Sequence, residues 1–110
     1  DAHLSLARSE IIADPDNEIL FSIASLWEIA IKLSRGKLAI SKSIDDVVAH
    51  IEGSTSILFA IAPEHLIHVA SLPFHHKDPF DRLIIAQSLV ENIPILTSDS
   101  NFSAYGVELL

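Results

Sequence analysis

Short apolar runs alternate with amphipathic stretches along this chain. Two runs, 18–23 and 56–61, are apolar at most positions, which is typical of strands that are buried on both faces. A third run at 93–97 has the same character, and we expect a fourth, edge strand at 107–110. The segments between the runs have helical periodicity. The pattern therefore predicts an α/β fold, with a parallel sheet sandwiched between helices in three layers.

Capping residues predict where the helices begin and end. Ser43 with Asp46 three residues later has the Ser-x-x-acid pattern of a capping box, and Ser25 with Glu28 has the same pattern. Proline opens helices and glycine ends them. The expected helices are 4–13, one capped by Ser25 and stopped by Gly36, one capped by Ser43 and closed by Gly53, 63–71, and one from Pro79 or Asp81 to about Val90.

Length and composition indicate one packed domain over residues 1–110. Hydrophobic residues make up 49% of the 110 residues and charged residues 20%, which is ample for a core. Because the chain has no cysteine, disulfides and thiolate metal sites are excluded, and a reducing cytoplasm is the expected location. No apolar run approaches the roughly 20 residues that a membrane span requires, so we expect no membrane partner.

The net charge of −8 is unusual for a nucleic-acid binder, because such proteins are usually basic. However, four of the seven basic residues fall within a short stretch: Lys32, Arg35, Lys37 and Lys42. A site that gathers carboxylates around a metal would itself add negative charge. The basic stretch is either a phosphate-binding surface or an ordinary solvated helix face.

Acidic side chains follow three of the predicted elements. Glu28 lies early in the helix after run 18–23, Asp78 and Asp81 lie where the helix near residue 80 begins, and Asp99 follows the run at 93–97. Ligands of such sheets bind beyond the carboxyl ends of the strands, so these acids are expected at one edge. Carboxylate oxygens suit Mg²⁺, which lowers the pKa of bound water and offsets phosphate charge.

Each acid also has an ordinary explanation. Glu28 can be a capping partner of Ser25, Asp78 and Asp81 can cap their helix, and Asp99 can be a turn residue. The histidines suggest no metal site, because neighbouring residues such as His75 and His76 seldom bind one ion together. We expect the remaining candidates, His65 and His68, to be surface or half-buried residues.

Three stretches resemble the PIN domains of VapC-type toxins. Ser22–Lys32 followed by Arg35–Leu38 is similar to the segment of the second acid, and His76–Gln87 is similar to the helix of the third. Leu96–Asp99 resembles the closing strand with the fourth acid, and the opening of the chain also fits. The resemblance extends over essentially the whole chain in the family's order.

The resemblance implies a Mg²⁺- or Mn²⁺-dependent endoribonuclease, a toxin of a type II toxin–antitoxin system that cleaves RNA phosphodiesters with metal-activated water. It also implies a homodimer and a cognate antitoxin. Glu28, Asp81 and Asp99 match the catalytic metal-site acids, and Asp78 would support them. Ser25 and Thr97 would hydrogen-bond to the carboxylates. RNA phosphates would be contacted by Lys32, Arg35 and Arg82.

One part of the family pattern has no match. The first acid of the family lies on an N-terminal strand, and no such segment precedes Asp1. We therefore expect an N-terminally incomplete domain that lacks its first strand and binds metal weakly or not at all. The alternative function is a non-catalytic PIN-like module that dimerises or captures an antitoxin. A receiver-like signalling domain fits poorly, because it needs a lysine after a late strand and none follows Lys77.

Overall fold

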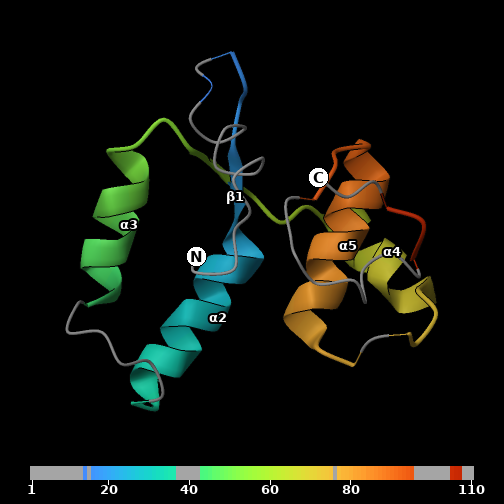
Figure 1. Ribbon diagram of the computed structural model, residues 1–110. Coiled ribbons are helices and arrows are strands. Elements are labelled where there is room, and N and C mark those ends of the chain that lie inside the picture. The colour runs from blue at the N-terminus through green and yellow to red at the C-terminus, as the bar shows by residue number, and fades with distance from the viewer. Residues whose placement is uncertain (1–13, 15, 37–42, 76, 96–104, 108–110) are drawn as a thin grey trace. The chain divides into compact units, whose positions relative to one another are not determined.

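The computed structural model describes residues 14, 16–36, 43–75, 77–95 and 105–107 (Figure 1). The chain divides into two compact units, one formed by Glu18–Ile61 and another that contains Ala62–Leu110. In the described ranges, the chain forms four helices and a small parallel sheet, which confirms the predicted α/β class. None of the helices described is long and apolar enough to span a bilayer.

The unit Glu18–Ile61 is built around two parallel strands. β1 (Leu20–Ser22) pairs with β2 (Ile57–Phe59), so that Leu20 lies opposite Ile57 and Ser22 opposite Phe59. Parallel strands require a long crossover connection, and helices α2 (Ile23–Ser34) and α3 (Ile44–Glu52) lie in that connection. Both strands fall within the predicted runs, and their paired parts are shorter than those runs.

Helix α2 follows β1 without a loop. Ser22 ends the strand in an extended conformation, and its hydroxyl oxygen accepts a hydrogen bond from the backbone N–H of Ala24 at 3.0 Å. The prediction that Ser25 caps this helix is therefore wrong. Ser25 is the third residue of α2, where its backbone is already helical. The serine that can cap is the one that retains the extended backbone of the strand.

The predicted boundaries of helix α3 are confirmed. Asp46 donates its backbone N–H to the Ser43 hydroxyl at 3.2 Å, and the Ser43 N–H donates to the Asp46 carboxylate at 3.3 Å. This reciprocal pair is the capping box that the sequence predicts. Gly53 forms the C-cap.

The second unit contains two helices that pack on each other. These are α4 (Pro63–Ser71) and α5 (Pro79–Glu91), both as predicted from the sequence. The central part of α5 is buried. Two of its residues, Ile85 and Ala86, form an apolar core with Leu72, Ile95 and Tyr105. Asn92 ends α5 in the left-handed conformation, with φ of 55°.

His65 is buried in this unit, which corrects the expectation of a surface or half-buried residue. Its side chain is 1% exposed. Its Nδ1 accepts from the N–H of Ala62, the N-cap of α4, at 2.9 Å, and its Nε2 lies 3.3 Å from Oε1 of Glu91. His65 is the third residue of α4, and its imidazole accepts from the N-cap N–H as the N3 side chain of a capping box does. His68 is half-buried, as expected.

Some predicted elements lie outside the described residues. They are the helix at 4–13 and the last residues of the strands at 93–97 and 107–110. Ile95, within the third predicted strand, forms a β-bridge.

Candidate active site

Asp78 and Asp81 lie at the beginning of α5. The Asp78 carboxylate is the N-cap, and its Oδ1 accepts from the backbone N–H groups of Phe80 at 2.9 Å and Asp81 at 3.0 Å. Asp81 is the third residue of the helix and is half-buried. The positive end of the helix dipole stabilises both carboxylates. Asp78 therefore has the capping role considered above, and it holds the backbone from which Asp81 projects.

Glu28 lies in the second turn of α2. Its Oε2 is 3.1 Å from Nζ of Lys32, with side-chain exposures of 26% for Glu28 and 50% for Lys32. Because Ser22 is the cap of this helix, Glu28 is three residues too far along α2 to be its capping partner. Capping therefore does not explain Glu28, whose partner in the structure is Lys32. Its role as a metal ligand stays a prediction.

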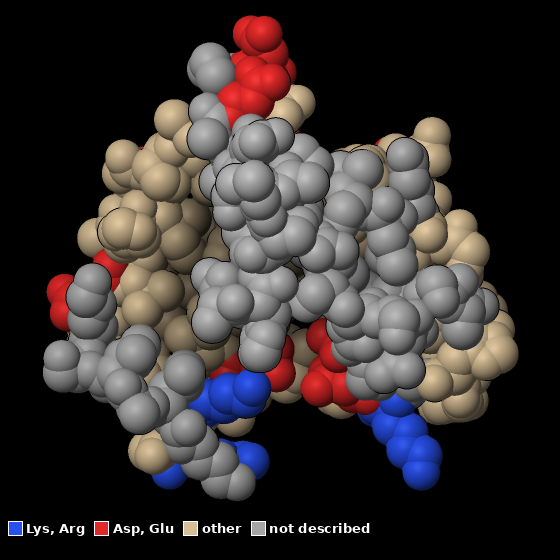
Figure 2. All heavy atoms as spheres, in the orientation of Figure 1, with Lys and Arg blue, Asp and Glu red and all other residues tan. Residues whose placement is uncertain are grey.

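The predicted RNA contacts on α2 are accessible. Lys32 lies in the last turn of the helix and Arg35 is its exposed C-cap. Figure 2 shows the Lys and Arg side chains of the described residues in small patches on the face in view, some of them beside Asp and Glu. The described residues include four cations, Lys32, Arg35, Lys77 and Arg82, so any phosphate contact by them would involve a few residues.

Arg82 is buried, in contrast to the two cations of α2. Its side chain is 6% exposed, and its guanidinium donates to the carbonyl oxygens of Pro73 at 2.8 Å, Leu72 at 3.2 Å and Val69 at 3.3 Å. These carbonyls lie at the end of α4 and just beyond it, where a cation is also favoured by the helix dipole. This corrects the interpretation of Arg82 as an RNA contact, and we assign it a structural role.

The proposed metal ligands lie in different parts of the chain. Glu28 belongs to the unit Glu18–Ile61, Asp81 to the other unit, and Asp99 and Thr97 lie outside the described residues. Within the described ranges, no three His, Asp or Glu side chains form a group that could hold a metal ion. The donor type fits Mg²⁺, since all three residues supply carboxylate oxygens. Their convergence on one ion stays a prediction.

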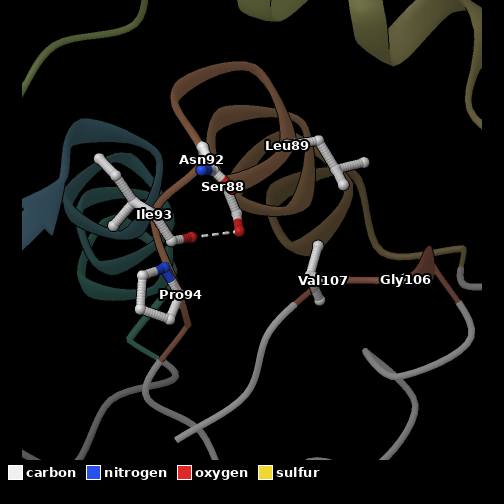
Figure 3. A pocket seen from close by; sticks show the side chains of 7 residues that line it. All are labelled: Ser88, Leu89, Asn92, Ile93, Pro94, Gly106 and Val107. Atoms are coloured by element: carbon white, nitrogen blue, oxygen red, sulfur yellow. Dashed lines mark hydrogen bonds between the residues drawn. The ribbon is translucent and has the colours of Figure 1, made fainter.

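A small hollow lies at the other end of α5. Ser88, Leu89, Asn92, Ile93, Pro94, Gly106 and Val107 line it, and the Ser88 hydroxyl donates to the Ile93 carbonyl within it (Figure 3). A helix of 13 residues is about 20 Å long, so the hollow is well separated from Asp78 and Asp81. None of its described lining residues is acidic or basic, so it is a poor candidate for the reaction site.

A family model, that of the PIN domain, matches residues 2–108, which is nearly the whole chain. This chain belongs to the PIN-domain family. PIN domains are generally nucleases, usually metal-dependent, and many act in toxin–antitoxin systems. No curated protein and no solved structure matches the chain.

One functional candidate of this PIN domain has no counterpart among the residues that the sequence singles out. Phe74 lies between α4 and α5, is 83% exposed, and has its ring over the guanidinium of Arg82. The available signal is an aromatic residue in a polar stretch with basic neighbours, His75 and Lys77. Such a stretch is unlike the apolar periodicity that predicts core residues.

Proposed function

We propose that this PIN domain is a Mg²⁺- or Mn²⁺-dependent endoribonuclease of the VapC type, the toxin of a type II toxin–antitoxin system in the cytoplasm. The observation that supports it most is the first turn of α5. There an aspartate cap, Asp78, holds the backbone of Asp81, in a chain that matches the family over 2–108. Because the Asp81 backbone is held by this hydrogen bond, its carboxylate is suited to bind a metal ion.

The proposed roles follow from the position of each side chain. Glu28, Asp81 and Asp99 hold the metal ion through carboxylate oxygens. Asp78 orients the first turn of α5 through its two backbone hydrogen bonds. When bound, Mg²⁺ would supply a Lewis acid that polarises the phosphate and activates water.

Two further residues complete the acid site as we propose it. Ser25 lies one turn before Glu28 on α2, at a spacing that places the two side chains on one face of the helix. From there the Ser25 hydroxyl would donate to the Glu28 carboxylate. Thr97 would do the same for Asp99, two residues further along the chain.

Lys32 and Arg35 would contact the RNA backbone. Both are accessible on the last turn and at the C-cap of α2. We propose RNA as the substrate, a second copy of the chain as the dimer partner, and a cognate antitoxin as the inhibitor. Many PIN domains have antitoxin partners, which supports the last of these.

Metal binding is the direct test of this proposal. Mn²⁺ is titrated by calorimetry into the parent protein and into Asp81→Asn and Asp78→Asn. Asparagine at 78 still caps a helix, so Asp78→Asn controls for the loss of one charge near the site. We expect weak but saturable binding by the parent protein, abolition in Asp81→Asn and binding in Asp78→Asn that is weaker than in the parent protein but still measurable. Equal binding by all three proteins would contradict the assignment of Asp81.

A second candidate function is supported by the ion pair of Glu28 with Lys32. The ammonium group already neutralises one of the proposed metal ligands. A PIN-like module with that pair intact would bind an antitoxin or another partner without cleaving RNA. Absence of Mn²⁺ binding in the parent protein would favour this function.

A further inference from the structure

Phe74 presents an aromatic ring to solvent from the stretch between α4 and α5. Its side chain is 83% exposed, although its ring lies 4.2 Å above the guanidinium carbon of Arg82. One face of the ring is therefore covered by a cation, and the exposed area belongs to the rest of the ring. A single exposed phenylalanine is common on protein surfaces and needs no explanation by itself. Phe74 differs because a buried guanidinium lies against its ring and fixes the position of that ring.

Arg82 holds the ring in a defined place. The guanidinium is buried and donates to the carbonyl oxygens of Leu72 and Pro73, which directly precede Phe74. Another hydrogen bond, of 3.4 Å, joins Arg82 Nη1 to the hydroxyl of Tyr105. The same Tyr105 ring meets His75 edge-on, with centroids 5.1 Å apart. Residues on both sides of Phe74 are thus anchored, and binding to its ring requires little further ordering.

The neighbours of Phe74 indicate which ligand the ring suits. His75 and Lys77 are both exposed, and Lys77 directly precedes the cap Asp78. Exposed aromatic and basic side chains in one short segment are the combination that recognises single-stranded nucleic acid, by base stacking and phosphate contact. Protein interfaces are also rich in aromatic residues but are depleted in lysine, so the exposed Lys77 favours a nucleic-acid ligand.

We propose that Phe74 is a stacking platform for an unpaired base of RNA, held in place by Arg82. This deepens the nuclease proposal and rests on it, since the platform precedes Asp78 and Asp81 by only a few residues. A paired base offers no free face, so the platform would direct the enzyme to single-stranded loops, bulges and ends.

The test is RNA binding without metal, so that no cleavage occurs. Fluorescence anisotropy with EDTA present measures the Kd of a labelled single-stranded oligouridine and of the same strand in a duplex with oligoadenosine. The proteins are the parent, Phe74→Ala, Phe74→Leu and Phe74→Tyr. Leucine keeps an apolar side chain of similar size without an aromatic face, whereas tyrosine keeps the face.

We expect Phe74→Ala and Phe74→Leu to weaken single-strand binding by roughly 5- to 150-fold, the usual effect of losing one base–aromatic stack. Phe74→Tyr should bind like the parent protein, and duplex binding should be the same in all four. Leucine that binds as well as phenylalanine would overturn the proposal, as would equal losses for single strand and duplex. Thermal unfolding of each variant confirms that the fold is intact, which the exposure of Phe74 leads us to expect.

The result separates this inference from the nuclease proposal. If Mn²⁺ binding and cleavage fail while single-strand binding still depends on Phe74, the nuclease proposal is wrong and the platform stands. If the protein cleaves RNA and Phe74→Ala changes neither binding nor cleavage, the platform is wrong and the nuclease stands. A parent protein that binds no RNA, and in which Phe74 is needed instead for self-association in light scattering, overturns the platform in favour of a protein contact.

Discussion

Lys32 and Glu28 form an ion pair one turn apart on α2, with Nζ 3.1 Å from Oε2. The glutamate precedes the lysine by four residues, which is the favourable order for such a pair on a helix. Both side chains are partly exposed, so the pair contributes little to stability. Its main consequence is functional, because Lys32 is a proposed RNA contact and Glu28 a proposed metal ligand.

The first prediction concerns Lys32→Gln. The free energy of unfolding should change by only about 0.3–0.5 kcal/mol, as for other helical pairs of this spacing. Mn²⁺ should bind up to about fivefold more tightly, because the cation that competes for Glu28 is gone. RNA binding should weaken, and the slope of log Kd against log salt concentration should fall by about 0.7 for a single strand. Calorimetry and anisotropy measure the two effects.

Arg35→Gln is the matched control, because Arg35 is an exposed cation just beyond the same helix. It should reduce the salt slope by a similar amount and leave the affinity for Mn²⁺ unchanged. If Lys32→Gln alters neither quantity, Lys32 is only part of a solvated helix face.

The second prediction separates the capping role of Asp78 from any role in metal binding. Asp78→Ala removes the acceptor of two backbone N–H groups and should lower the free energy of unfolding by about 0.5–2 kcal/mol. Asp78→Asn keeps an acceptor and should lower it by much less. Urea denaturation measures both. A loss as large for asparagine as for alanine would show that the charge of Asp78, rather than its hydrogen bonds, stabilises α5.

Local signals predict the boundaries of α3 and the beginning of α4, but not the cap of α2 or the lengths of the strands. Ser43, Gly53 and Pro63 act on their own neighbours, so the ends of α3 and the beginning of α4 could be predicted from the sequence. The cap of α2 could not, because Ser25 has the Ser-x-x-acid pattern with Glu28, whereas Ser22, which caps the helix, does not. The choice depends on where pairing with β2 keeps the backbone extended, which is a tertiary effect.

For the candidate site too, some features could be predicted from the sequence and others could not. Asp78 and Asp81 could be placed on the first turn of α5 because Pro79 marks where that helix begins. The burial of Arg82 could not be predicted, since its partners are backbone carbonyls 9 to 13 residues earlier, which no side-chain pattern reveals. An arginine beside an acidic motif is easily interpreted as a phosphate contact until those carbonyls are known.

The third prediction concerns the stability that Arg82 provides. In Arg82→Met, the carbonyls of Val69, Leu72 and Pro73 lose a charged donor, and the free energy of unfolding should fall by on the order of 3 kcal/mol. Arg82→Lys should lose a large part of this as well, because an ammonium group lacks the planar fork that reaches several acceptors at once. Urea denaturation gives the values, with the exposed Arg35→Met as control. A variant Arg82→Met as stable as the parent would contradict the structural role.

The last prediction concerns His65, which joins the beginning of α4 to the end of α5. Since Nδ1 accepts from the Ala62 N–H, the ring proton lies on Nε2, which donates to Glu91. Nitrogen-15 spectra of the imidazole should show this tautomer. His65→Leu leaves the Ala62 N–H without its acceptor in a buried place and should cost about 1–3 kcal/mol of unfolding free energy. Glu91→Ala should cost well under half as much, because Glu91 is 43% exposed and water can take its place beside Nε2. Equal losses in the two variants would mean that the bond to Glu91, and not the capping of α4, is what His65 contributes.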